Sequence, residues 1–513
     1  KEFGTKIELK KNRFVWLGST KPLDAFTYFF RNTPHGTIVA HSYQYEEGMS
    51  TWIFECSDET WQKHGFEITN EEDTIAKISE IFKDELDGHS LITNKSHWRK
   101  FPHVTNEKWF HNNIVLLGDA KATAHYSIGS GTKLAMDSAI GLSDAVIANP
   151  TNVQAAFEQY DKTRRNTVEM IQHAALVSLD WFENMDRNNQ HPFYQFAFGC
   201  MTRAKKVTFE NLRLRDKSFT DKVLKEFFQN QIPNPKFQIP NTVAAFTPFS
   251  LRKMTLHNRI VMAPMGQYSA ENGEVNDWHL VHYGSRATGG VGLILTEMTS
   301  VSETGRITLG CTGIYTKEQI VNWKRITDFI HATTQTKIGI QLGHSGRKGA
   351  AKKPWETEPI ENPWELISAS PIAFSESFST PKEMTLADMD LVTTQFVQAT
   401  QNADEAGFDL IELQAHHGFL LASFLSPLTN IRTDEFGGSI ANRLKFPLRV
   451  FNETRSVFPK EKPMSVRISA SDWAANGISE DDVLKISEAF KNAGADIINV
   501  STGNTVANQK PQT

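Results

Sequence analysis

A carboxylate and a glycine-rich turn in the first half of the chain could bind a polar cofactor. Gly118-Asp119 follows the apolar run Ile114–Leu117, and the turn that holds Gly129 and Gly131 leads into a helical pattern. A carboxylate at a strand end can accept hydrogen bonds from hydroxyl groups, and a glycine-rich turn lets backbone N–H groups approach an anionic group at a helix N-terminus. Ordinary strand-turn-helix corners contain the same short pattern, so these residues alone leave both interpretations open.

Other side chains carry weaker signals. His279 and His282 have the i, i+3 spacing of a metal-binding pair. No carboxylate or cysteine motif accompanies them, so we predict a structural role and no metal site. A basic run could hold the phosphates of a coenzyme A ester, although such runs are usually solvated surface. The run comprises Arg203, Lys205, Lys206, Arg213 and Arg215.

Length, composition and charge narrow the class of protein. The chain has 513 residues, several times the size of a typical domain, so we expect more than one domain. With a net charge of −5, the chain lacks the overall positive charge that favours binding to nucleic acid or to an anionic membrane. A hydrophobic content of 39% with 22% charged residues argues against disorder and against membrane spans. Three distant cysteines and an opening without an apolar leader predict a cytoplasmic protein.

Periodicity predicts an α/β protein in three parts: residues 1–149, 150–245 and 246–513. The first part combines antiparallel strands with short helices. We expect a buried strand at Ile114–Leu117 and a helix whose N-cap is Thr74. The middle part is helical and ends in a proline-rich linker over 231–245, our predicted domain boundary.

The last part alternates strands with amphipathic helices, a rhythm typical of a parallel sheet covered by crossover helices. Six β-branched runs predict its strands: Arg259–Ala263, Gly292–Thr296, Lys337–Gln341, Asp409–Leu413, Met464–Ile468 and Asp496–Val500. A closed (β/α)₈ barrel needs eight, so we expect an incomplete barrel that lacks strands 7 and 8. The strand-like opening and the polar end predict an internal fragment of a longer protein.

The string GDAKATAHYSIGSGTKLAMDSAI resembles the second flavin-binding motif of the FAD-dependent aromatic hydroxylases, the p-hydroxybenzoate hydroxylase class. More narrowly, the first half resembles the hydroxylase half of the bifunctional salicylyl-CoA 5-hydroxylase and 2-aminobenzoyl-CoA monooxygenase/reductase group. The resemblance implies that Gly118 and Asp119 hold the FAD ribityl chain and that Gly129 and Gly131 line the flavin side of the turn. Ser138 departs from the usual acidic residue, and the chain has no G-x-G-x-x-G motif for the FAD pyrophosphate.

Five separated motifs over residues 246–513 resemble the old yellow enzyme family, including its 2,4-dienoyl-CoA reductase branch: NRIVMAPMGQYS, WHLVHYGSRATGGVGLILTE, IGIQLGHSGRK, SPLTNIRTDEFGGSIANR and VRISASDW. The resemblance implies a (β/α)₈ barrel with FMN at the carboxyl ends of its strands. The FMN-binding residues it implies are Pro264, Met265, Gly266, Met298, Gln341 and Arg467. Gln341 would hydrogen-bond the flavin pyrimidine edge, and the charge of Arg467 would stabilise the reduced flavin.

The substrate-activating motif departs from the family pattern H-x-x-H-G-Y or H-x-x-N-G-Y. This chain has Gln414-Ala415-His416-His417-Gly418-Phe419 there. By resemblance, Gln414 and His417 hold the substrate carbonyl oxygen, whereas Phe419 cannot donate the proton that tyrosine supplies at that position. Tyr268, after the first strand, is our candidate proton donor.

Together these resemblances predict a two-flavin oxidoreductase that uses FMN, FAD and NAD(P)H. Its first half would use O₂ to hydroxylate an aromatic acyl-CoA thioester, and its barrel would reduce a conjugated carbonyl. Two alternatives stay open: a stand-alone enoate or 2,4-dienoyl-CoA-type reductase, and a degenerate, non-catalytic CoA-ester-binding module. We expect no nucleic-acid or membrane partner, leave a homo-oligomer open, and expect poor flavin retention because both phosphate-binding ends are missing.

Overall fold

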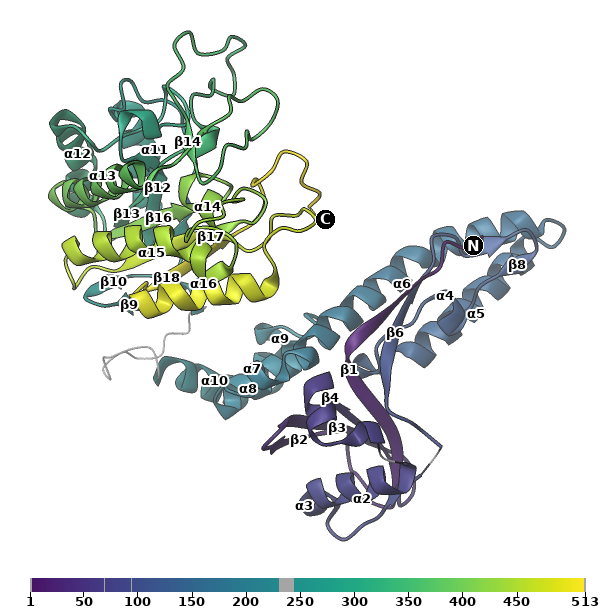
Figure 1. The fold of residues 1–513 in the computed structure, drawn as a ribbon. Coiled ribbons are helices and arrows are strands. Elements are labelled where there is room, and N and C mark those ends of the chain that lie inside the picture. The colour runs from purple at the N-terminus through teal and green to yellow at the C-terminus, as the bar shows by residue number, and fades with distance from the viewer. Residues whose placement is uncertain (1, 69, 94, 230–243, 512–513) are drawn as a thin grey trace. The chain divides into compact units, whose positions relative to one another are not determined.

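The computed structural model describes residues 2–68, 70–93, 95–229 and 244–511. The chain divides into two compact units, Lys1–Asn230 and Gln231–Thr513, both shown in Figure 1. The predicted helical part 150–230 thus belongs to the same unit as the strands that precede it. Most of the predicted linker, 231–243, lies outside the described residues.

An antiparallel sheet forms the centre of the first unit. Its strands are β1 (Lys6–Ser19), β2 (Thr27–Thr33), β3 (Gly36–Glu46), β4 (Met49–Cys56), β5 (Leu91–Ile92) and β6 (Arg99–Thr105). They are ordered β2-β3-β4-β1-β5, and β6 pairs with the other end of β1. Aromatic side chains, among them Trp52, Phe54 and Phe82, pack on this sheet and form its core.

Helices make up the rest of the first unit. They are α1 (Asp58–Lys63), α2 (Glu71–Ile81), α3 (Lys83–Leu86), α4 (Gly118–Lys121), α5 (Gly131–Ala148), α6 (Val153–Glu183), α7 (Met185–Asn188), α8 (Phe193–Thr202), α9 (Phe209–Arg215) and α10 (Lys217–Gln229). The 31-residue α6 runs alongside α5, and the two share a core that includes Leu134 and Tyr160. Helix α5 begins at Gly131, as the pattern predicts.

The predicted start of α2 is wrong. The N-cap is Asn70, whose side chain accepts the backbone N–H of Asp73 at 2.8 Å. Thr74 therefore lies inside the helix, where it is buried. Asn is a strong N-cap, and three acidic residues follow it at the positive end of the helix dipole.

The predicted buried strand Ile114–Leu117 is also wrong. Among the described residues it is reduced to β8 (Ile114–Val115), which pairs only with β7 (Phe110–His111). Ile114 is more than half exposed. A short apolar run does not distinguish a core strand from the edge of a hairpin, because both need the same residue types.

A parallel sheet of six strands, ordered β11-β12-β13-β16-β17-β18, forms the second unit (Figure 1). The strands are β11 (Val261–Met262), β12 (Leu293–Ser300), β13 (Lys337–Gly343), β16 (Leu410–Ala415), β17 (Met464–Ser469) and β18 (Ile497–Ser501). Each overlaps a predicted strand. Their order follows the chain, as in the winding of a (β/α) barrel, and β11 and β18 are the two edges of the sheet in the described residues.

Crossover helices cover this sheet. They are α11 (Asp277–Thr288), α12 (Lys317–Thr333), α13 (Leu386–Glu405), α14 (Leu420–Leu425), α15 (Ile440–Val457) and α16 (Glu480–Ala493). Two small ladders accompany them: β9 (Phe249–Leu251) with β10 (Met254–Leu256), and β14 (Ile367–Ser368) with β15 (Lys382–Glu383). Every residue of β16 is buried, as expected for a parallel strand covered on both faces.

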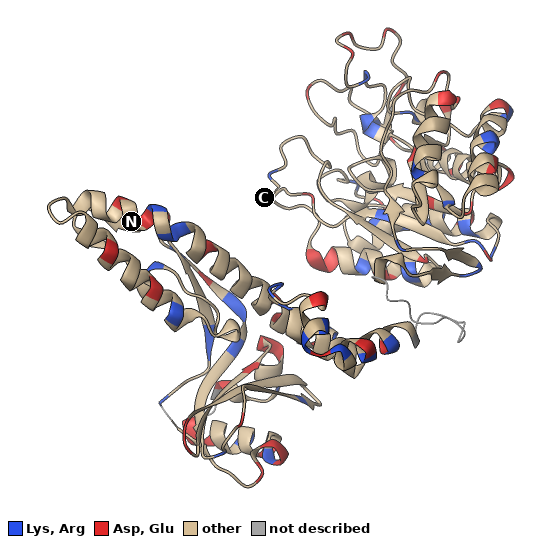
Figure 2. Ribbon diagram, turned by 180° about the vertical axis from the view of Figure 1, so that it is seen from behind, with Lys and Arg blue, Asp and Glu red and all other residues tan. Residues whose placement is uncertain are grey.

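Basic and acidic residues are interspersed along the helices of both units (Figure 2). Several form i, i+4 ion pairs, such as Lys63 with Glu59 and Lys133 with Asp137. No helix in the described parts of the chain has both the length and the hydrophobicity to cross a membrane.

Candidate functional site

Four of the predicted flavin and substrate residues of the second unit lie on neighbouring strands of the sheet. The register pairs Met298 with Gln341 and Gln414 with Arg467. All four stand in the carboxyl-terminal halves of β12, β13, β16 and β17, the edge at which parallel α/β sheets bind ligands. The structure therefore brings these four residues to one edge of the sheet.

Glu412 orients the amide of Gln341. Nε2 of Gln341 donates to Oε1 of Glu412 at 2.8 Å, while Oε2 accepts from Ser465 Oγ at 2.8 Å and Asn499 Nδ2 at 2.9 Å. Burial raises the pKa of Glu412, and these three hydrogen bonds lower it in part. The sequence pattern did not single out Glu412, although a lone carboxylate within the apolar run LIEL is a signal of a buried polar contact.

Gln414 is buried, and its side-chain oxygen has no hydrogen-bond partner among the described residues. A side chain at Gly343 would collide with this amide, so the glycine leaves it room. An unpaired buried amide group costs about 1–3 kcal/mol, which a ligand's hydrogen bond would offset. The amide can also turn over and present its N–H₂ group, because the two ends of the amide have the same shape.

Ser501, at the end of β18, contacts both Arg467 and His417. Its Oγ lies 2.7 Å from Nε2 of His417 and 3.4 Å from Nη2 of Arg467, whose Nε has no partner among the described residues. Burial, together with the charges of Arg467 and Lys348, lowers the pKa of His417 to about 4. His417 is therefore neutral at pH 7, and Ser501 sets the orientation of its ring.

Lys348 covers the position where a tyrosine is expected. Its Nζ donates to the backbone oxygens of His417 and Asn504 and lies 4.9 Å from the ring centre of Phe419. Burial lowers the pKa of Lys348 to about 8. Phe419 thus offers Lys348 an aromatic face and no proton.

The loop after β11 carries the other predicted residues, Pro264, Met265, Gly266 and Tyr268. Met265 and Gly266 are exposed, and Tyr268 is half-buried with a left-handed backbone (φ 51°). A Cβ at Gly266 would lie 3.1 Å from Cζ of Tyr268, so the ring lies directly over the glycine. Burial raises the pKa of Tyr268. No hydrogen bond joins Tyr268 to Gln414 or His417 in the described part of the chain.

His279 caps helix α11. Nδ1 of His279 accepts the backbone N–H of Asn276 at 3.1 Å and closes a capping box at the start of α11. Among the described residues, no three histidine, cysteine or acidic side chains gather as a metal site.

In the first unit, the predicted cofactor residues surround the start of α5. Gly118 and Gly129 both have left-handed backbone (φ 56° and 61°), a conformation that glycine adopts without strain. Asp119 is exposed on α4. Gly131 is the first residue of α5, so the turn leads directly into a helix N-terminus.

Lys121, which the sequence pattern did not single out, links three helices next to this turn. Its Nζ donates to Ser138 Oγ on α5 at 2.7 Å and to Tyr160 Oη on α6 at 2.8 Å. It also lies 4.3 Å from the ring centre of Trp109, and burial lowers its pKa to about 8. Ser138, the departure from the hydroxylase pattern, is thus the partner of a buried lysine.

Arg203 holds the other side of the turn. Its Nη2 donates to the backbone oxygen of Ser127 at 2.8 Å, and its Nε donates to Ser178 Oγ at 3.0 Å. The guanidinium also lies 5.1 Å from the ring centre of Tyr28. These contacts occupy the side chain, so Arg203 does not offer a coenzyme A phosphate a free cation.

A buried carboxylate, Glu55, lies beneath the turn. Its oxygens accept from Asn12 Nδ2 at 2.8 Å and Tyr126 Oη at 2.9 Å, and lie 3.0 Å from His41 Nε2. Burial raises the pKa of Glu55, but the hydrogen bonds of His41 and Asn12 and the nearby His125 outweigh it and bring the pKa to about 2.

We expect Glu55→Gln to lower the unfolding free energy of the first unit by about 3 kcal/mol at pH 7. The folded pKa is about 2, against 4.5 for a free glutamate, and each pKa unit is worth about 1.4 kcal/mol. Because the folded pKa is depressed, this stability is present above pH 4.5 and is lost as the pH falls toward 2. Hydrogen exchange of β3 and β4 amides at pH 7 and pH 3 measures it. The exposed Glu47→Gln is the control, and an equal loss at both pH values would contradict the assignment.

Comparison with known proteins shows which family the second unit resembles. Residues 244–513 match the model of the NADH:flavin oxidoreductase / NADH oxidase family. NADPH dehydrogenase of Geobacillus sp. (strain WCH70) is 41% identical over 263 residues, which are 51% of this chain and 73% of that protein. NADPH dehydrogenase of Bacillus subtilis (strain 168) is 41% identical over 260 residues, 50% of this chain and 73% of that protein.

Among solved structures, morphinone reductase is 27% identical with a TM-score of 0.45 over 50% of this chain and 71% of that chain. 2-Naphthoyl-CoA reductase in complex with 2-naphthoyl-CoA is 23% identical with a TM-score of 0.47. The match covers 51% of this chain and 40% of that longer chain.

Proposed function

Because the chain belongs to the NADH:flavin oxidoreductase / NADH oxidase family, we propose that its second unit holds FMN and reduces a conjugated carbonyl compound with NAD(P)H. The chain is a flavin oxidoreductase of the old yellow enzyme type. The specific substrate and the site residues are our proposal. The observation that carries it is the row of Gln341, Gln414 and Arg467 on adjacent strands, with unpaired polar atoms on the last two.

The polar groups of Gln341 and Arg467 fit a flavin. The oriented amide of Gln341 can hydrogen-bond the polar edge of its ring, and the half-buried Arg467 supplies a fixed positive charge. FMN, when bound, supplies a carrier that takes hydride from NAD(P)H and passes it to the substrate. Pro264, Met265, Gly266 and Met298 are proposed to contact it from the neighbouring strand ends.

The substrate residues act on the carbonyl oxygen. Gln414 and the neutral His417 would donate hydrogen bonds to it, where negative charge develops as hydride reaches the β-carbon. Tyr268 would donate a proton to the α-carbon. NAD(P)H, a proton and the conjugated carbonyl thus yield NAD(P)⁺ and the saturated carbonyl.

The test uses the 513-residue chain with FMN in excess, because we expect this chain to retain flavin poorly. We expect flavin absorbance bands that bleach with NAD(P)H without oxygen and return on addition of 2-cyclohexen-1-one. Arg467→Ala should weaken FMN binding about 10- to 100-fold, the range expected for a charge-assisted hydrogen bond. Arg449→Ala, on the solvent side of α15, is the control. A chain that binds acyl-CoA but no added FMN would support the non-catalytic module and contradict this proposal.

We further propose that the first unit is the flavin-side part of an FAD-dependent aromatic hydroxylase that acts on an aromatic acyl-CoA with O₂. The left-handed Gly118 and Gly129 and the exposed carboxylate of Asp119 support this, because a ribityl chain needs close backbone approach and an acceptor. Because we expect this chain to retain flavin poorly, equilibrium dialysis should show weak FAD binding that Asp119→Ala weakens further. With NAD(P)H as the two-electron reductant, oxygen consumption by FAD-loaded protein in the presence of benzoyl-CoA is expected, one oxygen atom entering the ring and the other leaving as water. Its absence would favour the stand-alone reductase, in which the first unit only docks.

A further inference from the structure

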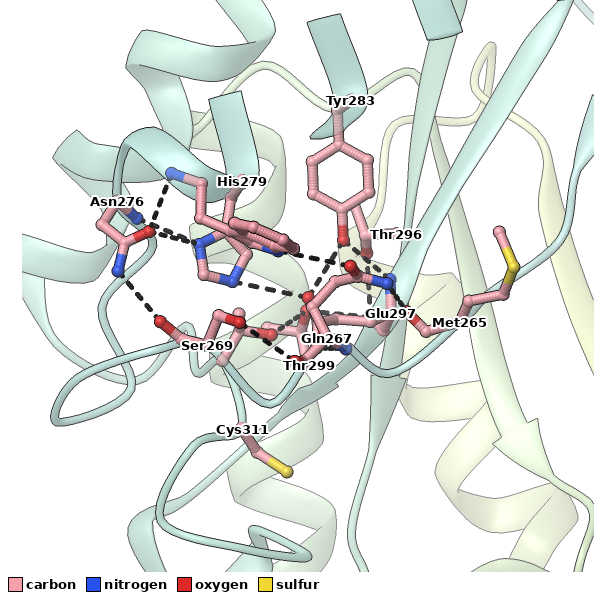
Figure 3. Close-up of polar contacts among 12 residues, drawn as sticks. Met265, Gln267, Ser269, Asn276, His279, Tyr283, Thr296, Glu297, Thr299 and Cys311 are labelled. Carbon is pink, nitrogen blue, oxygen red and sulfur yellow. Dashed lines mark hydrogen bonds and ion pairs between the residues drawn. The ribbon is translucent and has the colours of Figure 1, made fainter. Parts of the chain in front are cut away.

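A buried carboxyl group, Glu297, lies behind the loop that carries Tyr268. Glu297 stands on β12 and is 2% exposed. Its Oε2 accepts the backbone N–H of Gln267 at 2.8 Å, and the backbone N–H of Tyr268 also stabilises its ionised form. Figure 3 shows the carboxyl group between this loop and helix α11. The proposed reaction above assigns Glu297 no role.

Helix α11 supplies the groups on the other side of the carboxyl. Tyr283 Oη donates to Oε1 of Glu297 at 3.3 Å and accepts the backbone N–H of Glu297 at 3.0 Å. Nε2 of His279 lies 3.5 Å from Oε1. Nε2 of His279 makes no hydrogen bond with the described residues, so Tyr283 is the group of α11 that bonds the carboxyl. Glu297 is therefore held by the loop on one side and by α11 on the other.

The loop needs such a support, because Tyr268 is in a strained conformation. A left-handed backbone is disfavoured for residues with a Cβ and persists only where neighbouring contacts hold it. The position of the Tyr268 ring also requires glycine at 266, since any side chain there would meet the ring. The hydrogen bonds between Glu297 and the backbone of residues 267 and 268 fix the loop, and the absence of a side chain at Gly266 leaves room for the ring. Together they determine where the phenol lies.

We propose that Glu297 is a positioning residue that sets the direction of the Tyr268 phenol through the backbone N–H groups of residues 267 and 268. The expected effect on kcat rests on the proposed function, because Tyr268 is the proposed proton donor. The effect of Glu297 on the position of the phenol does not depend on any reaction and can be observed in the chain without flavin.

The position of the phenol should depend on pH near neutrality. Burial raises the pKa of Glu297 to about 7, although the bonds from Gln267, Tyr283 and Tyr268 lower it in part. A carboxylate accepts both loop N–H groups, whereas a protonated carboxyl has one oxygen that donates instead. The titratable groups facing Glu297 are Tyr283 and His279 on α11, and Tyr268 and Cys311 on the loops. Burial keeps all four neutral at pH 7.

Fluorine NMR of the flavin-free chain labelled with 3-fluorotyrosine tests the geometry. The Tyr268 resonance, assigned with Tyr268→Phe, should shift with pH and show a midpoint near 7. Glu297→Gln should abolish this titration, and Glu271→Gln, an exposed acid of the same loop, should leave it unchanged. A Tyr268 resonance that does not titrate, or that titrates equally in Glu297→Gln, would overturn the proposal.

A double-mutant cycle tests the kinetic consequence. Glu297→Leu removes the acceptor and should lower kcat for enone reduction at least 10-fold in the native background, but by less than 2-fold in the Tyr268→Phe background. Equal losses in both backgrounds would overturn the positioning role. If Tyr268→Phe alone leaves kcat unchanged, the proton-donor assignment fails, while the fluorine titration still decides the positioning. Circular dichroism checks folding, and Glu297→Gln provides the test if the leucine variant unfolds.

Discussion

Tyr268→Phe is expected to lower the turnover of enone reduction about 100-fold, because general-acid catalysis contributes roughly 10²–10⁴-fold. Phe419 stands where a tyrosine would be expected, and its ring packs beneath Lys348, so it supplies no proton. Burial keeps the Tyr268 phenol protonated by raising its pKa. The loss should fall on reduction of the enone alone, since bleaching of the flavin by NAD(P)H needs no proton from Tyr268.

Stopped-flow absorbance separates the two half-reactions and so measures this prediction. The bleaching rate with NAD(P)H should match that of the native chain, while the return of absorbance with 2-cyclohexen-1-one should slow about 100-fold. Tyr45→Phe, the same change on an exposed strand end of the first unit, should alter neither rate. Equal slowing of both half-reactions would mean that Tyr268 binds flavin and is not the donor.

The parallel sheet could be predicted because its signal is local. All six strands of the second unit overlap short runs rich in β-branched residues, and the central strand β16 is buried along its whole length, as in a parallel sheet covered on both faces. Ile114–Leu117 shows the limit of that signal. The same residue types form a two-residue hairpin edge there, because no core strand lies beside them among the described residues. Whether an apolar run becomes a core strand or a hairpin edge therefore depends on the strand that pairs with it, which the run itself does not specify.

The sequence predicts residues of the candidate site only where they stand at a strand end within a motif. Gln341, Gln414 and Arg467 stand at such positions, and the structure places them on adjacent strands. Glu412 and Glu297 were missed because each acts through partners far away in sequence. Lys121 is a third case, since the contacts that give it a role come from Ser138 and Tyr160. Contacts between residues far apart in the sequence cannot be inferred from the spacing of residues along the chain.

Glu412→Leu is expected to lower the unfolding free energy of the second unit by about 4 kcal/mol. The substitution leaves Gln341 and Ser465, both fully buried, without an acceptor, and each unsatisfied donor costs about 1–3 kcal/mol. Asn499 is partly exposed and can turn to water. Urea unfolding followed by hydrogen exchange of β13 and β16 amides measures the loss, with the exposed Glu405→Leu on α13 as the control.

Glu412→Gln separates the orientation of Gln341 from the stability of the sheet. A glutamine at 412 can keep its oxygen toward Ser465 and Asn499 and present its N–H₂ group to Gln341, which then turns its own amide over to accept. Stability should fall by about 1 kcal/mol or less, because every buried group keeps a partner. The polar edge that Gln341 offers to the flavin would be reversed, however, so a donor would replace an acceptor. We therefore expect FMN affinity to fall about 10-fold in this variant, measured by fluorescence titration. An unchanged affinity would mean that Gln341 does not contact the flavin, since the substitution alters little else in the site.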